Sequence, residues 1–224
     1  MLKTVIFDMD GVILDSEPLY YEAELKVMEE IGVFLTKEEH DSLVGAPSLE
    51  VWKLCKTKLD IPFTAEELDD KECQVYIDIL KSQSNVEPIS GIPELLKELK
   101  DKSARIALAS SSVVKIIDLV VELLGIRHMF DVLVSGQHVE NGKPAPDIFL
   151  LAAEKTGSLP EECVVIEDSK NGVLAAKKAG MKCIAFKDPV KNSQDVSLAD
   201  HIVDDINKLD YNVIEKVNLG IIPS

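Results

Sequence analysis

Two aspartates stand close together near the start of the chain, in the segment 5–11 (VIFDMDG). Asp8 and Asp10 follow a short apolar run, and Gly11 lets the chain turn directly after them. Two carboxylates held this close repel each other, and a bound divalent cation with oxygen ligands is the usual remedy. Two aspartates in isolation are more often part of a solvated turn. An assignment as a reaction site therefore requires further polar groups nearby.

A run of serines and one lysine could supply the donors and the positive charge that such a site needs. Ser110, Ser111 and Ser112 offer hydroxyl and amide groups suited to phosphate oxygens, although such a run equally suits the start of a helix. Lys143 stands before two prolines in the segment 143–147 (KPAPD), which stiffen its backbone. A freely solvated lysine does not need such a backbone, so a fixed position for this cation is indicated.

Glu167 and Asp168 add two more carboxylates, again directly after an apolar run. Taken singly, each of these polar groups is more readily explained as structural. Taken jointly, they bring hard oxygen ligands, hydrogen-bond donors and one cation to the ends of predicted strands. In open α/β sheets the carboxyl ends of the strands are where ligands bind.

The elements that must position these residues are short β-branched runs separated by segments of helical periodicity. Five strands are predicted, over residues 4–7, 104–109, 132–134, 163–166 and 182–186. Continuously apolar strands that alternate with helices predict a parallel sheet covered on both faces. We therefore expect an α/β fold with a three-layer, Rossmann-like core and a mostly parallel sheet.

The region after the first strand differs, because it contains no convincing strand pattern. Helix starts are predicted there at an N-cap serine or a Thr-x-x-Glu capping box: Ser16, Ser48, Thr36–Glu39 and Thr64–Glu67. We therefore expect a small all-α insert over residues 15–83, within an α/β core formed by residues 1–14 and 84–224.

Charge and composition exclude several classes of function. The 224-residue chain carries 40 acidic against 24 basic side chains, a net charge of −16, which disfavours binding to nucleic acid or anionic membranes. A small phosphorylated ligand is still allowed, because local cations or a metal can outweigh the distant field. No apolar run approaches the roughly 20 residues that span a bilayer. We expect a cytoplasmic protein with reduced cysteines, and a monomer or weak homo-oligomer.

The ordered set of polar groups resembles the motifs of the haloacid dehalogenase superfamily of phosphotransferases, over essentially the whole chain. The motifs that carry the resemblance are Asp8-x-Asp10, Ser110, Lys143-Pro144 and Glu167-Asp168. The segment 10–18 (DGVILDSEP) and the helical insert are similar to the subgroup of β-phosphoglucomutase and related sugar-phosphate phosphatases. The resemblance implies a catalytic core and, in the insert, a cap domain that closes over the site.

The resemblance implies a role for each carboxylate. Asp8 would be the nucleophile that forms an aspartyl-phosphate, and Asp10 would protonate the leaving alcohol and then activate water. Mg²⁺ would be held by Asp8, the backbone carbonyl of Asp10, and Asp168, with Glu167 on or near the metal. An acid at position 10 makes carbon–halogen cleavage a poor interpretation, because dehalogenase relatives lack it.

The remaining site residues follow from the same resemblance. Lys143 and Ser110 would neutralise and orient the phosphoryl oxygens, and Ser111 would bind the substrate beside them. Within the cap, Tyr20 and the loop from Gly45 to Ser48 are candidates for recognising the substrate. Ordinary helix contacts and a turn explain these cap residues about equally well.

Three departures from the mutase pattern favour hydrolysis of a small phosphate monoester over a mutase reaction. A sugar phosphate is the expected substrate. Where the mutase pattern has Ser-x-Ser-Lys-Asn, this chain has two valines after its serines; Ser48 replaces an arginine, and Tyr20 replaces a histidine. These changes remove much of the site for a second phosphate. Lys53 or Lys71 could restore a cation, so a phosphohexose mutase stays open as an alternative. A phosphate-binding regulator without turnover is the alternative from another class.

Overall fold

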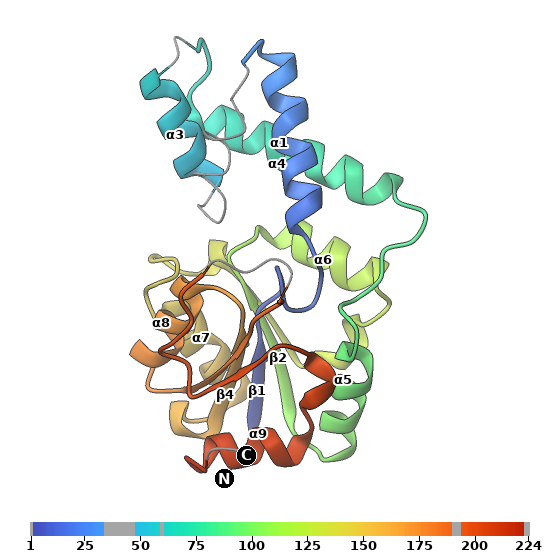
Figure 1. The fold of residues 1–224 in the computed structure, drawn as a ribbon, viewed down its shortest axis with the longest axis vertical. Helices are drawn as coiled ribbons and strands as arrows, with labels where there is room; N and C mark the ends of the chain where they lie inside the picture. The colour runs from blue at the N-terminus through green and yellow to red at the C-terminus, as the bar shows by residue number, and fades with distance from the viewer. Residues whose placement is uncertain (1, 34–47, 59–60, 190–193, 222–224) are drawn as a thin grey trace. The chain divides into compact units, whose positions relative to one another are not determined.

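The computed structural model describes residues 2–33, 48–58, 61–189 and 194–221. Contacts divide the chain into two compact units. We call residues 1–15 with 87–224 the core unit, and residues 16–86 the insert unit. Figure 1 shows the described helices and strands of both.

The core unit is built on a six-stranded sheet in the order β3-β2-β1-β4-β5-β6, in which every pair of neighbours is parallel. The strands are β1 (Thr4–Phe7), β2 (Arg105–Ser110), β3 (Val132–Ser135), β4 (Cys163–Glu167), β5 (Lys182–Phe186) and β6 (His201–Val203). The predicted α/β fold with a parallel sheet is confirmed, and the five predicted strands differ from the observed ones by at most one residue at either end. The edge strand β6 was not predicted.

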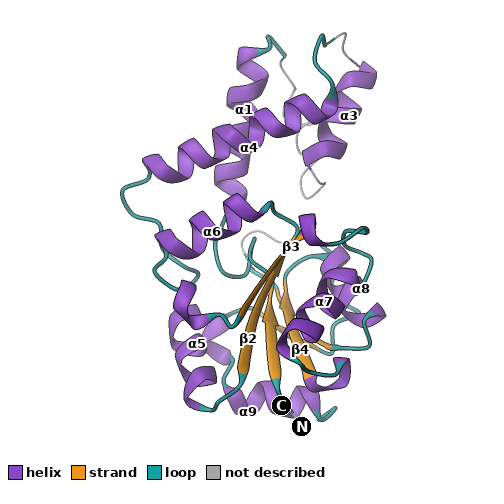
Figure 2. Cartoon of the chain, turned by 180° about the vertical axis from the view of Figure 1, so that it is seen from behind, coloured by secondary structure: helices purple, strands orange, loops and turns teal. Residues whose placement is uncertain are grey.

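Helices cover both faces of this sheet, as Figures 1 and 2 show for α5 on one side and α7 with α8 on the other. The helices of the core unit are α5 (Ile92–Asp101), α6 (Val114–Leu123), α7 (Asp147–Thr156), α8 (Lys170–Lys178) and α9 (Tyr211–Asn218). Short 3₁₀ turns lie at η1 (Arg127–Met129), η2 (Gly136–His138), η3 (Pro160–Glu162) and η4 (Ile206–Lys208). Because side chains alternate along a strand, Ile6 and Val165 bury against α7 and α8, whereas Val5 and Val164 face the opposite layer. The central strand β1 is therefore buried from both sides.

Helices are the regular secondary structure of the insert unit among its described residues: α1 (Glu17–Glu30), α3 (Ser48–Lys58) and α4 (Ala65–Ser82). Both α1 and α3 pack against α4, around a core that includes Val27, Trp52 and Leu68. The predicted capping box at Thr64 forms, with reciprocal hydrogen bonds of 3.1 and 2.7 Å to Glu67. Ser16 precedes α1 as predicted but makes no side-chain cap bond, and the box predicted at Thr36–Glu39 lies outside the described residues.

Within the described ranges, no helix is both long and apolar enough to cross a membrane.

Candidate active site

Asp8 lies at the carboxyl end of the central strand, where the order of the strands reverses. Strands β2 and β3 lie on one side of β1, and β4, β5 and β6 lie on the other. The amide of Asp8 continues the ladder to β4, donating to the carbonyl of Ile166 at 2.9 Å. A reversal of this kind opens a crevice at the sheet edge, which is where α/β proteins bind ligands. The fold thus puts Asp8 in the favoured position for a ligand site.

Lys143 joins this carboxylate to a second one. Its Nζ donates to Asp8 Oδ1 at 2.5 Å and to Glu167 Oε1 at 2.8 Å, with a longer bond of 3.3 Å to the carbonyl of Ala109. The ammonium also lies 4.9 Å from the ring centroid of Phe149, which is fully buried. Only 7% of the Lys143 side chain is exposed. The lysine is a fixed, buried cation, as the two prolines after it predicted.

Glu167 is held by donors at both of its oxygens. While Oε1 accepts from Lys143, Oε2 accepts from the backbone amide of Ser169 at 2.6 Å. The carboxylate fills the space beside Gly172, where an added Cβ would come within 1.6 Å of Glu167 Oε1. The absence of a side chain at position 172 is therefore what admits this glutamate.

Asp8, Glu167 and Asp168 form a cluster that could hold a metal ion, because each offers a carboxylate oxygen within 4.8 Å of the others. Among the described residues, Asp168 accepts no hydrogen bond and forms no ion pair, unlike its two neighbours. Its carboxylate lies against Gly11, where an added Cβ would be 2.1 Å from Asp168 Oδ2. The cluster thus combines hard oxygen ligands, an open carboxylate and close packing, which fits a divalent cation.

The pKa values of the cluster show that its negative charge is not balanced by one lysine. Burial raises the pKa of Asp8 to about 7; the charge of Lys143 opposes the rise, and Glu167 and Asp10 add to it. Burial likewise raises the pKa of Asp168 to about 9, together with the charges of Glu167 and Asp8. Burial alone would lower the pKa of Lys143, but the two carboxylates that it contacts raise it above its ordinary value. A bound cation would relieve this repulsion.

Asp10 is not a member of the three-carboxylate cluster, and two serines hold its side chain. The hydroxyls of Ser110 and Ser112 donate to Asp10 Oδ2 at 3.1 and 3.0 Å, and the amide of Ser112 donates to Ser110 Oγ at 3.0 Å. The alternative explanation of the serine run as a helix cap is wrong, since α6 has Val113 at its N-cap and no side-chain cap bond. The sequence analysis included Ser112 among the donors but gave it no role at Asp10. Ser111, the predicted substrate-binding residue, is exposed beside them.

The substrate-binding residues predicted in the insert unit make contacts within that unit. The ring of Tyr20 stacks on that of Tyr76 with centroids 3.9 Å apart. The hydroxyl of Ser48 donates to Glu72 Oε2 at 2.6 Å. Gly45 lies outside the described residues. The expected roles of these residues toward a substrate stay predictions.

Glu72 is a buried carboxyl group that the sequence did not reveal. The indole Nε1 of Trp52 donates to its Oε2 at 2.6 Å, the same oxygen that accepts from Ser48. Burial raises the pKa of Glu72 to about 7, partly offset by the two hydrogen bonds. An acidic residue within the pattern of an exposed helix gives no sequence signal for such a position.

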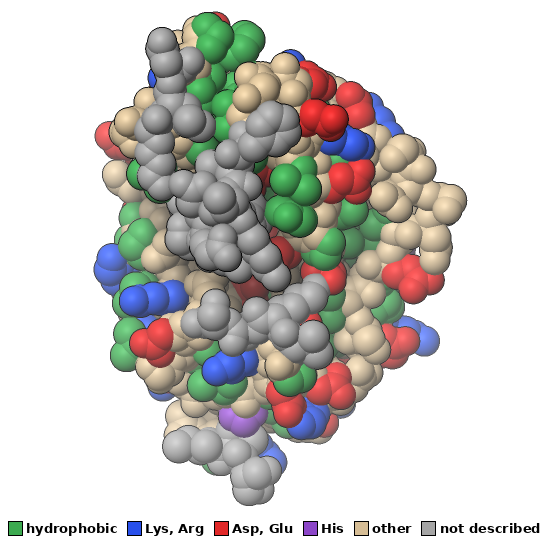
Figure 3. All heavy atoms as spheres, turned by 45° about the horizontal axis from the view of Figure 1, so that its top comes forward, with side chains coloured by type: hydrophobic (Ala, Val, Ile, Leu, Met, Phe, Trp, Pro, Cys, Tyr) green, Lys and Arg blue, Asp and Glu red, His purple; other side chains and the backbone are tan. Residues whose placement is uncertain are grey.

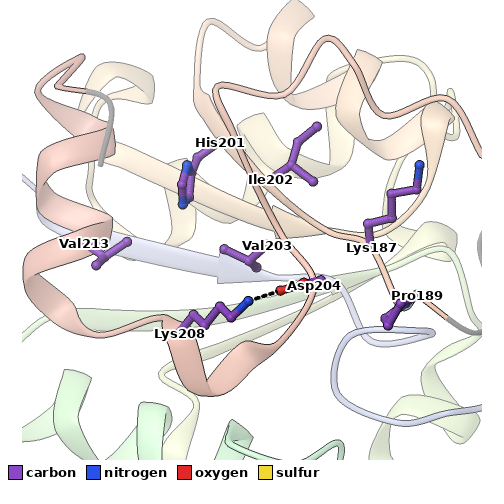
Figure 4. A pocket seen from close by; sticks show the side chains of 8 residues that line it. All are labelled: Lys187, Pro189, His201, Ile202, Val203, Asp204, Lys208 and Val213. Carbon is purple, nitrogen blue, oxygen red and sulfur yellow. Dashed lines mark hydrogen bonds and ion pairs between the residues drawn. The ribbon is translucent and has the colours of Figure 1, made fainter. Parts of the chain in front are cut away.

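A pocket of about 800 Å³ beside the edge strand β6 is separate from this chemistry. Figure 4 shows the residues that line it: Lys187, Pro189, His201, Ile202, Val203, Asp204, Lys208 and Val213. Asp204 and Lys208 form an ion pair with each other there. None of these residues belongs to the carboxylate cluster or was predicted to act in the reaction.

Charged side chains of both signs are present on the one face of the molecule that Figure 3 shows. On the face shown in Figure 3, acidic and basic side chains lie interspersed. With a net charge of −16, an anionic ligand at this site would have to be held by local groups rather than by the field of the whole molecule.

A parallel α/β sheet with carboxylates and a buried lysine at the carboxyl edge of β1 and β4 defines a Rossmann-like enzyme core. Comparison with known families makes the assignment specific: the chain belongs to the family of haloacid dehalogenase-like hydrolases, whose profile matches residues 5–186. The resemblance drawn from the sequence motifs is thereby confirmed.

Similarity to individual proteins is consistent with this family assignment. The chain is 37% identical over 187 residues to a phosphorylated carbohydrates phosphatase of Thermotoga maritima, covering 82% of this chain and 84% of that protein. It is 33% identical over 184 residues to the fructose-1-phosphate phosphatase YqaB of Escherichia coli, covering 80% and 94%. The crystal structure of a β-phosphoglucomutase from Clostridium difficile superposes with a TM-score of 0.82 at 27% identity, over 98% of each chain. The chain is thus placed among the phosphatases of its superfamily.

Proposed function

We propose that this protein is a Mg²⁺-dependent phosphatase that hydrolyses a small phosphate monoester, a sugar phosphate above all, through a phosphorylated Asp8. One observation carries the proposal: Lys143 bridges Asp8 and Glu167 at the sheet edge, within a cluster that also contains Asp168. Relatives named as phosphatases of phosphorylated carbohydrates and of fructose 1-phosphate support the choice of substrate class.

The first step transfers the phosphoryl group to the protein. A carboxylate oxygen of Asp8 forms a bond to phosphorus while the bond from phosphorus to the substrate alcohol breaks. Asp10 gives its proton to the departing alkoxide, so that the alcohol leaves neutral. Mg²⁺, held by Asp8, Asp168, the Asp10 carbonyl and, directly or nearby, Glu167, would offset the repulsion between two anionic reactants.

The second step regenerates the enzyme. The deprotonated Asp10 removes a proton from a water molecule, whose oxygen attacks phosphorus as the bond to Asp8 breaks. Inorganic phosphate leaves, and both aspartates return to their starting states. Lys143 and Ser110 stabilise the charge on the phosphoryl oxygens in both steps, and Ser111 contributes donors from the exposed side of the same loop.

The insert unit is proposed as the cap that recognises the substrate, with residues 15–83 as the cap domain and residues 1–14 and 84–224 as the catalytic core. Tyr20, Gly45 and Ser48 are its candidate contacts with the substrate. A cytoplasmic monomer or weak homo-oligomer is proposed with this function. Reduced cysteines are supported by the four cysteine positions, all within the described residues, because none of them forms a disulfide: Cys55, Cys73, Cys163 and Cys183.

A phosphate-release assay tests the proposal. The purified protein would be incubated with p-nitrophenyl phosphate, fructose 1-phosphate, glucose 6-phosphate, β-glucose 1-phosphate and sorbitol 6-phosphate, with Mg²⁺ or with EDTA. We expect Mg²⁺-dependent release from at least one sugar phosphate and its loss in Asp8→Asn, which keeps the size of the side chain. Undiminished hydrolysis by Asp8→Asn would show that the nucleophile is wrongly assigned.

A phosphohexose mutase is the second candidate, favoured by the similarity to the β-phosphoglucomutase structure. Two observations count against a mutase. The serine run continues into Val113 and Val114, where the mutase pattern has lysine and asparagine. Lys71, one of the two lysines that could bind a second phosphate, is ion-paired with Glu30 at 2.6 Å. Incubation with β-glucose 1-phosphate and a trace of the bisphosphate separates the candidates. Glucose 6-phosphate without free phosphate would indicate the mutase. Tight binding of phosphorylated ligands without any turnover would instead indicate a regulator.

A further inference from the structure

The segment that follows β3 contacts the serine run that holds Asp10. The two lie side by side because β2 and β3 are paired in parallel, with Ser110 opposite Ser135. The hydroxyl of Ser135 donates to the carbonyl of Ser112 at 2.6 Å. Ser135 is itself fixed, since its Oγ accepts from the amide of Gln137 at 3.1 Å and its amide donates to His138 Nδ1 at 3.0 Å. Only 1% of this serine is exposed.

Gly136 adds a second contact between the same two segments. An added Cβ at this glycine would lie 2.6 Å from the carbonyl oxygen of Ser111. The backbone of Gly136 is not in the left-handed region, so close packing rather than conformational freedom requires the glycine. The carbonyls of Ser111 and Ser112 are therefore both positioned by the segment after β3.

From these contacts we infer that Ser135, together with Gly136, is a positioning residue for Asp10. The hydroxyl of Ser135 fixes the backbone of Ser112, and the hydroxyl of Ser112 directs one carboxylate oxygen of Asp10. The inference rests on the proposed function, in which Asp10 protonates the leaving alcohol. General acid catalysis requires a proton donor within hydrogen-bond reach of the leaving oxygen, so a small displacement of this carboxyl group reduces the rate.

A comparison of leaving groups separates this role from a general effect on folding. A sugar alkoxide is a poor leaving group and needs the proton from Asp10, whereas p-nitrophenolate leaves with little assistance. Since kcat/KM reports the steps up to departure of the alcohol, misplacement of Asp10 must reduce it selectively for the sugar phosphate. Activity toward the aryl phosphate then shows that the variant is folded and that Asp8 still reacts.

The experiment uses the full chain, p-nitrophenyl phosphate and the best sugar phosphate of the panel above. We expect Ser135→Ala to lower kcat/KM for the sugar phosphate about 10-fold, mainly through kcat, and that for the aryl phosphate less than about threefold. Ser135→Thr keeps the hydroxyl and should restore the sugar-phosphate value to within about threefold of the parent. Ser158→Ala is the matched control, because Ser158 is a buried serine bonded at 2.7 Å to Thr4, at the opposite end of β1.

The glycine provides an independent arm. Gly136→Ala should show the same selective loss, because it displaces the Ser111 carbonyl, whereas Gly142→Ala should not, because position 142 opens onto free space. Equal losses on both substrates, as expected for a purely structural residue, would overturn the inference, and so would an unchanged Ser135→Ala. If the parent protein releases no phosphate from any compound of the panel, the proposed function fails instead.

Discussion

Replacing Glu72 by glutamine should stabilise the insert unit at neutral and alkaline pH but not at acidic pH. The pKa of Glu72 rises from 4.5 to about 7, which corresponds to about 3 kcal/mol between its two protonation states. The folded state thus holds a proton that the unfolded state has released in this range. The contribution of Glu72 to the free energy of unfolding therefore falls as the pH rises from about 4.5 to about 7, and stays low above it. Glutamine is neutral throughout and keeps an acceptor for Ser48 and Trp52.

The fluorescence of Trp52 can be used to measure the stability of the insert unit. Trp52 is the only tryptophan, and its indole donates to Glu72 itself, so intrinsic fluorescence follows unfolding of the insert unit. Urea titrations at pH 4.5 and pH 8 should give Glu72→Gln and the parent equal stability at the lower pH, and up to about 3 kcal/mol more for the variant at the higher. Glu29→Gln, on the exposed surface of α1, is the control and should track the parent. A Glu72→Gln variant less stable than the parent at pH 8 would refute the reasoning, because the charged form would then be the favoured one.

Three further predictions concern the core unit. Lys143→Met should lower kcat/KM for phosphate release about 10³-fold, because it removes a buried cation bonded to Asp8; a loss under tenfold would contradict its role. Gly11→Ala should raise the Mg²⁺ concentration needed for half-maximal activity at least about tenfold, since the new Cβ overlaps Asp168; Gly32→Ala, also at positive φ but in open space, should not. Burial raises the pKa of the Cys163 thiol to about 12, so mass spectrometry should find it unlabelled by iodoacetamide in the native protein at pH 8 and labelled after denaturation.

The sequence predicted the sheet well because its central strands are buried on both faces and so are continuously apolar. The edge strand β6 escaped prediction for the opposite reason. It has three residues, one of them the partly exposed Ile202, and it lies between polar segments. What marks it as a strand is pairing with β5, a contact between distant parts of the chain that no local pattern encodes. A short edge strand of this kind is defined by its pairing with the neighbouring strand rather than by its own sequence.

The convergence of the site was also predictable, because parallel strands bring their carboxyl ends to one edge. Knowing the order of the polar groups along the chain was enough to expect Asp8, Lys143 and Glu167 together. The second layer of contacts was not predictable. Ser135 and Glu72 contact their partners through the packing of separate elements, and nothing in their neighbouring residues marks them. Sequence patterns thus identify the polar groups at strand ends, whereas the residues that orient those groups can be identified only in the folded structure.

The close approach between Gly172 and Glu167 links the evolution of these two positions. Any side chain at 172 would occupy the place of Glu167 Oε1, the oxygen that accepts the hydrogen bond from Lys143, so a substitution there displaces this oxygen from its ion pair. A side chain at 172 would therefore be accommodated most easily beside a shorter residue at 167. The residue type near the start of α8 is therefore constrained by the glutamate at the end of the neighbouring strand β4.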